Sequence, residues 1–401
     1  MLETLHEMGG QAEAGDVIDA LNDRLNIPDH IRNDYREMDF GKWGTRRRNP
    51  WRQTLHWVRQ NAVTRGLMEK RGHGVWGLSN AGRDSLVNAE GGLILIVYET
   101  SHGQAIWAEA RTAAAHLQQD SVQLIFTSPP YPILNGRKYG SFSESEILEL
   151  LVGCARDWKR ALTPDGSLVL NLRDVWRPKS ETGGAVRSLY QEKLLLALAE
   201  DVGLYFADRF YWRNPSHSPE SCWVTVHKVR TNNDVEHLFW LGKSPTPFAN
   251  TREVMVDAKP STIETYLRRG RRGVQGTTVG PSTQNTNFEE QMQAVANGQS
   301  LKVIPRNYLE IPNSDTHRKL REALKAAKLP RHDAMMPERL AEFFVRLLTR
   351  PQDCVYDPFY GSGTTGKVAE ELGRRWIGSD RSLAHVLGSA LRFPSVNYGA
   401  G

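Results

Sequence analysis

The chain has 401 residues, which exceeds one typical domain and predicts two or more folded units. Its hydrophobic content of 39% is enough for a globular core, while the lack of a signal peptide or of roughly 20 consecutive apolar residues predicts a cytoplasmic protein without a membrane span. The net charge of +5 is compatible with nucleic acid as a partner but does not require it.

Residues 1–90 have the pattern of a separate domain. Helical periodicity runs over 14–25 and again over 54–70, and a tight turn at 71–74 precedes an apolar segment at 75–78. Helices followed by a small hairpin predict a winged helix.

A basic cluster, Arg46-Arg47-Arg48, lies between Trp43 and Trp51 in the sequence. We expect Arg46 and Arg47 to contact the phosphates of duplex DNA. The alternative is a docking or dimerisation domain in which the basic loop is only solvated.

Residues 91–243 alternate strand-like and helix-like segments, as a doubly wound α/β sheet does. The expected strands are 93–97, 122–126, 167–172, 205–212 and 236–241, and the expected helices are 144–161 and 190–201. The polar, glycine-containing segment 177–187 is expected to be a mobile loop that can act as a lid.

A Ser-Pro-Pro-Tyr motif, Ser128 to Tyr131, follows the expected strand 122–126. Two prolines cannot continue a helix or a central strand, so the chain leaves the sheet in a stiff, extended turn. The turn presents the Ser128 hydroxyl, backbone carbonyls and the Tyr131 ring. The ring can stack on a flat base and the oxygens can accept hydrogen bonds from an exocyclic amine. Taken alone, the motif also fits a proline-rich loop that closes an edge strand.

Residues 244–316 are rich in Gly, Thr, Asn and Gln and contain few apolar residues. The cluster Arg268, Arg269, Arg271 and Arg272 lies within them. We interpret the segment as a target-recognition element, since Arg can read guanine and Asn or Gln can read adenine in the major groove. A disordered linker is the alternative.

Residues 317–401 contain a glycine-rich turn, 357–366, between a short apolar segment and an expected helix at 367–372. Strand, glycine-rich turn and helix form the geometry in which a nucleotide-like cofactor meets backbone N–H groups. The next expected strand, 375–380, ends in Asp380, where an acidic residue can bind a ribose diol.

Together, the Ser-Pro-Pro-Tyr motif and the segment Asp-Pro-Phe-Tyr-Gly-Ser-Gly-Thr-Thr resemble the amino-group DNA methyltransferases. Their order along the chain is that of the β-class, and Ser128 is typical of cytosine-N4 members, whereas adenine-N6 members more often have Asp. The resemblance covers about residues 91–390 and implies a Rossmann-like methyltransferase sheet with an inserted target-recognition segment. Residues 49–51 and 76–79 resemble the N-terminal domain of some restriction-system proteins.

The resemblance implies a catalytic half at 91–243 and a half that binds S-adenosylmethionine at 317–401. The implied catalytic residues are Ser128, Pro129, Pro130 and Tyr131. The implied cofactor-binding residues are Asp357, Phe359, Gly361, Gly363, Thr364, Thr365, Asp380 and His332. Double-stranded DNA is the implied substrate, in the nucleoid of a bacterium or archaeon. A cognate restriction endonuclease and a homodimer are left open.

Three other functions compete with cytosine-N4 methylation. Adenine-N6 methylation is disfavoured by Ser128 without being forbidden. An NTPase is suggested by Gly361 to Lys367, which fit G-x-x-x-x-G-K, but Val368 stands where magnesium binding needs Ser or Thr. A non-catalytic DNA-binding regulator would leave the paired motifs unexplained.

The three cysteines, Cys154, Cys222 and Cys354, show no metal-ligand spacing, and we expect no metal site. None follows a proline, which argues against carbon-5 cytosine methylation, because that reaction needs a thiolate nucleophile. We expect all three to be buried as small apolar residues.

Overall fold

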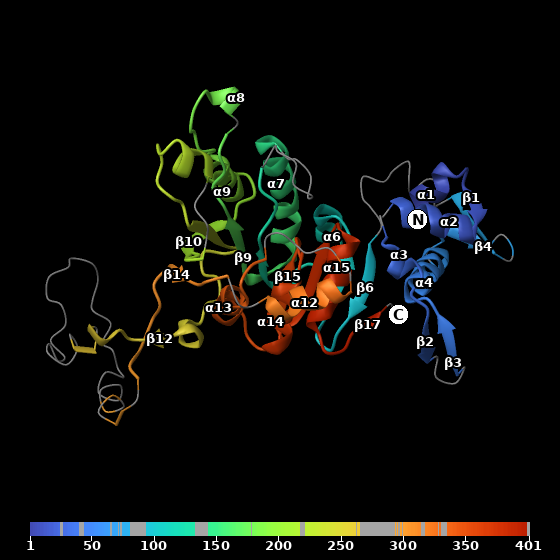
Figure 1. The fold of residues 1–401 in the computed structure, drawn as a ribbon. Helices are drawn as coiled ribbons and strands as arrows, with labels where there is room; N and C mark the ends of the chain where they lie inside the picture. Colours follow the sequence, from blue (N-terminus) through green and yellow to red (C-terminus); the bar gives the residue numbers. More distant parts are fainter. Residues whose placement is uncertain are drawn as a thin grey trace.

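The computed structural model contains a ten-stranded sheet flanked by helices and a group of shorter elements at the N-terminal end (Figure 1). The structure describes the whole chain except residues 25–26, 40–43, 65, 71, 73, 81–93, 133–142, 178, 217–220, 262, 265–292, 294, 296, 299, 314–316, 328, 330–334 and 399–401. Among the described residues, no helix is long and apolar enough to cross a membrane.

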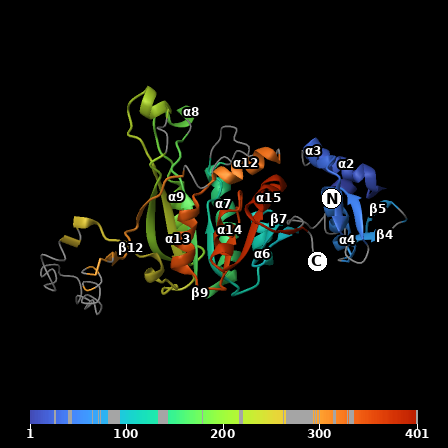
Figure 2. The same cartoon turned by 60° about the horizontal axis from the view of Figure 1, so that its bottom comes forward.

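The N-terminal elements build two small sheets and four helices within the described residues. They are α1 (Leu2–Glu7), β1 (Gln11–Glu13), α2 (Ala14–Arg24), α3 (Asp29–Arg32), β2 (Arg36–Asp39), β3 (Thr45–Arg48), α4 (Pro50–Thr64), β4 (Met68–Lys70) and β5 (Val75–Leu78). Strands β1, β5 and β4 form one antiparallel sheet, and β2 pairs with β3. Both ribbon views place this group at one end of the molecule (Figure 1, Figure 2).

The large sheet has the order β14-β10-β11-β9-β8-β15-β16-β7-β6-β17. Its strands are β6 (Leu95–Glu99), β7 (Gly103–Trp107), β8 (Val122–Thr127), β9 (Leu162–Leu172), β10 (Tyr205–Arg213), β11 (Val235–Gly242), β14 (Tyr308–Glu310), β15 (Cys354–Asp357), β16 (Arg375–Asp380) and β17 (Asn397–Tyr398). The central strands β9, β8, β15, β16 and β7 are parallel, whereas β11 and β6 run antiparallel to their neighbours in this centre.

Helices cover both faces of this sheet. The helices of this part of the chain are α6 (Ala110–His116), α7 (Glu144–Ala161), α8 (Lys179–Thr182), α9 (Tyr190–Glu200), α12 (Arg318–Ala326), α13 (Glu338–Leu348), α14 (Thr364–Glu371) and α15 (Leu383–Ser389). Shorter elements are η2 (Ser221–Val226), η3 (Thr251–Val254), β12 (Val256–Asp257), β13 (Lys302–Val303) and η4 (Ala390–Arg392). Helices α6, α7 and α9 pack in one layer, and α13 packs against α14.

The central strand β8 shows why both faces are covered. All of its residues are buried, the polar Gln123 and Thr127 included, as expected for a parallel strand covered on both faces of an α/β sheet. Phe126 stacks on Phe344 of α13 on one face, whereas Ile125 belongs to the core formed with α7 on the other. Alternation along the strand thus feeds two hydrophobic cores.

The expected strands and the helices at 144–161 and 190–201 are confirmed to within a few residues at their ends. The helix predicted over 54–70 is wrong at its C-terminal end, since α4 stops at Thr64 and Met68–Lys70 forms β4. Gly66 has a φ of 74°, a left-handed conformation that ends a helix readily. The pairing of β4 with β5 then outweighs the helical pattern.

The helix predicted over 367–372 begins three residues earlier in the structure. Helix α14 starts at Thr364, because Gly363, with a φ of 75°, already serves as its N-cap. The sequence predicts no element between 98 and 121, where the structure has β7 and α6. Segment 177–187 contains α8, and its last residue, Arg187, forms a β-bridge with Trp176, which precedes the segment.

The sequence predicts few core-forming residues in 244–316, but the structure buries several apolar side chains near the C-terminal end of this segment. Leu301, Leu309 and Ile311 are buried, and β14 extends the large sheet by pairing with β10. Both ribbon views place β12 at the opposite end of the molecule from the N-terminal elements (Figure 1, Figure 2).

Candidate active site

The Ser-Pro-Pro-Tyr motif and the glycine-rich turn meet in space at the carboxyl ends of two central strands of the sheet. Strands β8 and β15 are parallel neighbours, with Leu124 opposite Val355, so both chains leave the sheet at the same end. The Thr127 hydroxyl donates a hydrogen bond of 2.6 Å to Oδ1 of Asp357. The residue before Ser128 is therefore tied directly to the first residue of the glycine-rich turn, although they lie 230 positions apart.

The order of the strands predicts a ligand site at these carboxyl ends. After β8 the chain returns through α7 to β9, and after β15 it returns through α14 to β16, which lies on the other side of the pair. The strand order therefore reverses between β8 and β15. In open α/β sheets, ligands bind outside the carboxyl ends of the strands at such a switch point.

The polar groups of the Ser-Pro-Pro-Tyr loop, residues 128–131, lie close to one another. Oγ of Ser128 lies 3.2 Å from the Tyr131 hydroxyl and 3.4 Å from Nδ2 of Asn171 on β9. Pro129 is buried, while Ser128, Pro130 and Tyr131 keep part of their surface exposed. The Tyr131 ring packs against the hydrophobic core on the α7 side, as does Phe359. Two partly exposed aromatic rings thus lie on the same core.

A buried polar cluster lies behind Tyr131. Nδ2 of Asn171 donates to Oε2 of Glu236 at 2.8 Å. Burial of its carboxyl group raises the pKa of Glu236, against hydrogen bonding by Asn171 and attraction by Arg173, which lower it. Burial also raises the pKa of Tyr131, and the neighbouring Glu236 raises it further. Among the described residues, Oδ1 of Asn171 accepts no hydrogen bond.

Asp357 organises the start of the glycine-rich turn. Its Oδ1 also accepts the backbone N–H of Phe359 at 3.1 Å, and its Oδ2 accepts the Thr365 hydroxyl at 2.7 Å. Burial raises the pKa of Asp357 to about 6, although these hydrogen bonds favour the charged form. The Thr365 hydroxyl, which the sequence assigns to the cofactor, is thus directed to Asp357.

The glycine turn depends on left-handed backbone at Gly361 and Gly363, whose φ values are 49° and 75°. A side chain at Gly363 would in addition lie 2.7 Å from Cβ of Ser389. No side chain caps the N-terminus of α14 at Gly363. Its first backbone N–H groups therefore point out of the helix end where a ligand can meet them.

Asp380 ends β16 and contacts the same turn. Its Oδ2 accepts the backbone N–H of Gly361 at 2.8 Å, and its Oδ1 accepts that of Ser382 at 2.7 Å. Burial disfavours the carboxylate, but His385 and these backbone groups together lower the pKa of Asp380 below its ordinary value. Asp380 is therefore ionised, and it holds the glycine turn in addition to any contact with a ribose.

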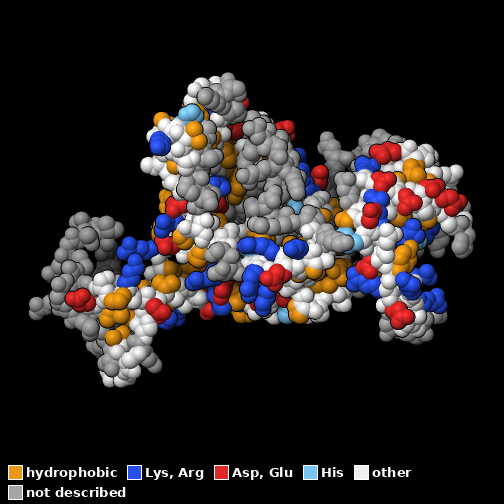
Figure 3. All heavy atoms as spheres, viewed as in Figure 1, with side chains coloured by type: hydrophobic (Ala, Val, Ile, Leu, Met, Phe, Trp, Pro, Cys, Tyr) orange, Lys and Arg blue, Asp and Glu red, His pale blue; other side chains and the backbone are white. Residues whose placement is uncertain are grey.

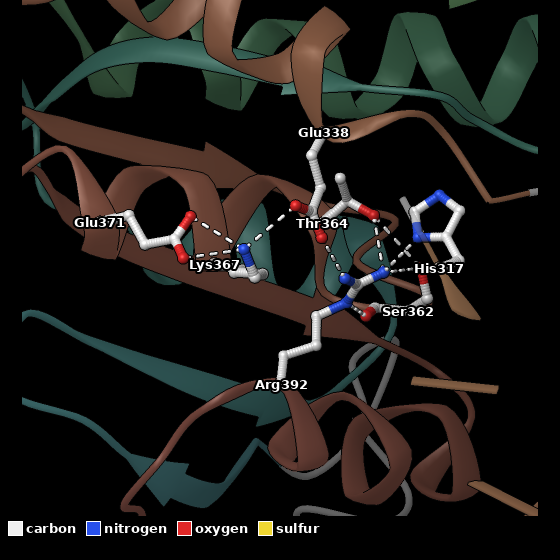
Figure 4. Close-up of polar contacts among 7 residues, drawn as sticks. All are labelled: His317, Glu338, Ser362, Thr364, Lys367, Glu371 and Arg392. Carbon is white, nitrogen blue, oxygen red and sulfur yellow. Dashed lines mark hydrogen bonds and ion pairs between the residues drawn. The ribbon is translucent and has the colours of Figure 1, made fainter. Parts of the chain in front are cut away.

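Arg392 of η4 ties the glycine turn to distant parts of the chain (Figure 4). Its guanidinium donates to the carbonyl of Ser362, to Oε1 of Glu338 at 2.9 Å and to the Thr364 hydroxyl at 3.2 Å, and it lies 3.0 Å from Nδ1 of His317. The side chain is only 2% exposed. Thr364, a predicted cofactor residue, thus belongs to a buried hydrogen-bond network.

The remaining predicted residues lie elsewhere. His332 and the cluster Arg268, Arg269, Arg271 and Arg272 lie outside the described residues. Arg46 and Arg47 are exposed on β3, in the N-terminal group, and the structure does not bring them to the glycine turn. Cys154 and Cys354 are buried, as expected, whereas the side chain of Cys222 lies outside the described part.

Sequence reasoning assigned no role to three residues that contact the predicted site: Asn171, Glu236 and Arg392. A signal existed for Glu236, which is the single acidic residue of strand β11, where every residue after His237 is apolar or glycine. Arg392 gave no such signal, because its partners come from separate, distant segments of the chain.

Comparisons with known proteins show what the chain is similar to. The family described as DNA methylase matches residues 122–389, and the Mrr N-terminal domain matches residues 1–88. The Type II methyltransferase M.PvuII of Proteus hauseri is 31% identical over 308 residues, covering 75% of this chain and 86% of that relative. M.SmaI of Serratia marcescens, also a Type II methyltransferase, is 25% identical over 301 residues, covering 68% and 84%.

A solved structure named PvuII DNA methyltransferase (cytosine-N4-specific) has a TM-score of 0.58 and 28% sequence identity with this chain. The match covers 75% of this chain and 89% of that structure. The predicted methyltransferase sheet is thereby confirmed. The chain belongs to the DNA methylase family and is a DNA methyltransferase that carries an Mrr N-terminal domain.

Proposed function

We propose that the protein transfers a methyl group from S-adenosylmethionine to the N4 amine of a cytosine rotated out of duplex DNA. The hydrogen bond between Thr127 and Asp357 carries this proposal, because it holds the base-binding loop against the cofactor turn. Cytosine is favoured over adenine by Ser128 and by the relative whose structure is named cytosine-N4-specific.

The residues at the switch point fit S-adenosylmethionine. The uncapped N-terminus of α14 suits an anionic carboxylate, and the acidic Asp357 and Asp380 suit a cation and hydroxyl groups. Oδ2 of Asp357 and Oδ2 of Asp380 each accept one hydrogen bond, from Thr365 and Gly361, so each can accept a second. Phe359 offers a partly exposed ring beside them. When bound, the cofactor supplies an electrophilic methyl group attached to a positively charged sulfur.

The chain's own residues position the amine. Rotating the nucleotide out of the stack costs a few kcal/mol, which the loop must recover by stacking and hydrogen bonding. The Tyr131 ring stacks on the base, while Oγ of Ser128 and the Pro129 carbonyl accept the amine hydrogens. Oδ1 of Asn171, unpaired among described groups, offers a further acceptor. Fixing donor and acceptor in line is then most of the catalysis.

The N-terminal unit, proposed to be a winged helix over residues 1–90, is assigned to DNA contact. Basic side chains gather over the β2–β3 pair (Figure 3). Burial lowers the pKa of His56, and the positive charges of Arg52, Arg59 and Arg48 lower it further, so all three lie within electrostatic range of that side chain. Like charges gathered in this way repel one another unless a polyanion such as DNA neutralises them.

Each of the other three segments of the chain also has a proposed role. Residues 91–243 supply the base loop, 244–316 recognise the target with Arg268 to Arg272, and 317–401 bind the cofactor, with His332 beside it. The restriction-modification setting of the Type II relatives supports a cognate endonuclease, and a homodimer is compatible with it. Such a protein would work on the nucleoid in the cytoplasm of a bacterium or archaeon.

Mass spectrometry of nucleosides tests the proposal. Duplex DNA incubated with the protein and isotope-labelled S-adenosylmethionine should yield labelled N4-methylcytosine. Labelled N6-methyladenine would overturn the choice of base, and the absence of label from DNA would overturn the reaction itself. Sequencing for modified bases in cells with and without the protein would give the recognition site.

A further inference from the structure

The polar cluster behind Tyr131 has a chemical feature that binding the base does not use. Its partly exposed residue Glu236 accepts a hydrogen bond from Nδ2 of Asn171 at 2.8 Å, and the same Nδ2 lies 3.4 Å from Oγ of Ser128. The Tyr131 hydroxyl is close enough to Glu236 to shift the pKa of its carboxyl group. That hydroxyl lies 3.2 Å from Oγ of Ser128. A chain of three oxygen groups therefore leads from the proposed amine position to a carboxylate.

We propose that Glu236 is the final acceptor of the proton that the target amine releases on methylation, reached through the hydroxyl groups of Ser128 and Tyr131. This inference rests on the proposed function. It assigns Glu236 a part in the reaction that neither the two sequence motifs nor the comparisons give it.

Atoms and charges balance in this step. The amine nitrogen bonds to the methyl carbon of the sulfonium donor, and the electron pair of the broken carbon–sulfur bond stays on sulfur. The nitrogen then carries a positive charge and one hydrogen too many. That hydrogen passes to Oγ of Ser128, the Ser128 hydrogen passes to the Tyr131 oxygen, and the Tyr131 hydrogen passes to Glu236, which ends as a neutral carboxylic acid.

The charges around Glu236 suit an acceptor. Arg173 and the Tyr131 hydroxyl both favour its ionised form. Tyr190 of α9 also lies within electrostatic range, and burial raises its pKa well above the ordinary value, so it stays neutral. His237, next along β11, hydrogen bonds to Gln191, and burial lowers its pKa. Burial in turn raises the pKa of Glu236, which brings an acceptor closer to working pH.

The test uses the full-length protein and the variant Glu236→Gln, which keeps the size of the side chain. Single-turnover methylation is measured at saturating DNA and cofactor from pH 5 to 8. The wild-type rate should fall toward acid with a one-proton slope, because protonated Glu236 accepts nothing. The variant should be slower by about 100-fold at pH 7.5 and lack this slope. Glu342→Gln, on the surface of α13, is the matched control and should behave as wild type.

Tyr131→Phe supplies the second variant, because it keeps the ring and removes the relaying hydroxyl. Its rate should also no longer decrease toward acid pH. The double variant should be no slower than the slower of the two single variants. Full turnover with an unchanged pH profile in Glu236→Gln would overturn the relay, as would additive losses in the double variant. Since the wild-type rate and its methylated product are read in the same assay, failure of the relay is distinguished from failure of the proposed function.

Discussion

At the scale of single residues, Asp357 shows how a carboxylate can be part of both the fold and the site. It is 4% exposed and accepts hydrogen bonds from Thr127, Phe359 and Thr365. Those bonds compensate part of the cost of burying a charge. The same contacts fix the Ser-Pro-Pro-Tyr loop, the glycine turn and the first turn of α14 relative to one another.

Ser128→Ala should slow single-turnover methylation by about 100-fold while leaving the dissociation constant of S-adenosylmethionine nearly unchanged, because Oγ is proposed to contact the base rather than the cofactor. Rapid-quench kinetics and calorimetry measure the two quantities. Ser121→Ala, at the opposite end of β8, is the control and should keep the full rate. An unaltered rate in Ser128→Ala would remove the role proposed for that hydroxyl.

The affinity for S-adenosylmethionine should depend on the ionisation of Asp357, whose pKa is raised by burial to about 6. Below that pH the carboxyl group is neutral and no longer attracts the cationic ligand. Binding measured by calorimetry should therefore be about tenfold weaker at pH 5 than at pH 7. Asp353→Asn should keep this dependence, whereas a pH-independent dissociation constant in the wild type would contradict the contact.

The raised pKa of Asp357 also has a consequence for folding. Between about pH 4 and 6 the folded protein holds a proton that the unfolded chain releases, since an ordinary Asp titrates near 4. The contribution of Asp357 to the free energy of unfolding therefore decreases as the pH rises through this window. Its burial is not a source of stability at neutral pH, which fits a residue that serves a ligand.

At the scale of elements, α14 is held against β16 by close packing rather than by helix propensity. Tyr360 stacks on Trp376 at 5.5 Å between ring centroids, and Gly366 lies against both rings. The helix can approach the sheet this closely because Gly366 has no side chain. Its N-terminus is thereby fixed at the end of β15, where the cofactor turn begins.

Gly366→Ala should therefore destabilise the protein by about 2 kcal/mol, although alanine is the better helix former. A Cβ there would collide with the Tyr360 hydroxyl and lie 2.9 Å from the Trp376 ring. Gly15→Ala in α2, where the new Cβ would meet nothing within 4 Å, should be neutral or stabilising. Calorimetric unfolding checks both, and two changes of the same sign would refute the packing argument.

At the scale of the whole molecule, the proposed DNA-binding segments lie toward the ends of the protein and the proposed site of methyl transfer lies at its centre. The switch point between β8 and β15 lies in the middle of the sheet order, with β14 and β17 at its two edges. The N-terminal elements and β12 lie at opposite ends of the molecule (Figure 2).

Removing residues 1–90 should leave the dissociation constant of S-adenosylmethionine within about twofold, because the residues proposed to bind it all lie in the last quarter of the chain. Affinity for duplex DNA should fall, and its dependence on salt should become shallower by about one for each phosphate that the shortened protein no longer neutralises. Titrations at several salt concentrations measure this. If the shortened and the full-length protein had the same affinity for DNA and the same dependence on salt, the arginines of α4 and β3 would not contact DNA.

The sequence by itself determined the two motifs, most strands and helices, and the strand, glycine turn and helix of the cofactor half. These features are local, because apolar periodicity, proline, and glycine with positive φ act on neighbouring residues. The N-terminal limit of α14 and the end of α4 escaped prediction, since a glycine N-cap at Gly363 and the pairing of β4 decided them.

Only the tertiary structure decided which polar groups meet. Thr127 and Asp357 are 230 positions apart, Arg392 and His317 are 75, and Asn171 and Glu236 are 65. The order and register of the strands bring these pairs together, and no local pattern encodes that order. A buried polar group needs a partner, but the sequence does not say which one, because the partner is chosen by where the hydrophobic faces of distant strands and helices pack.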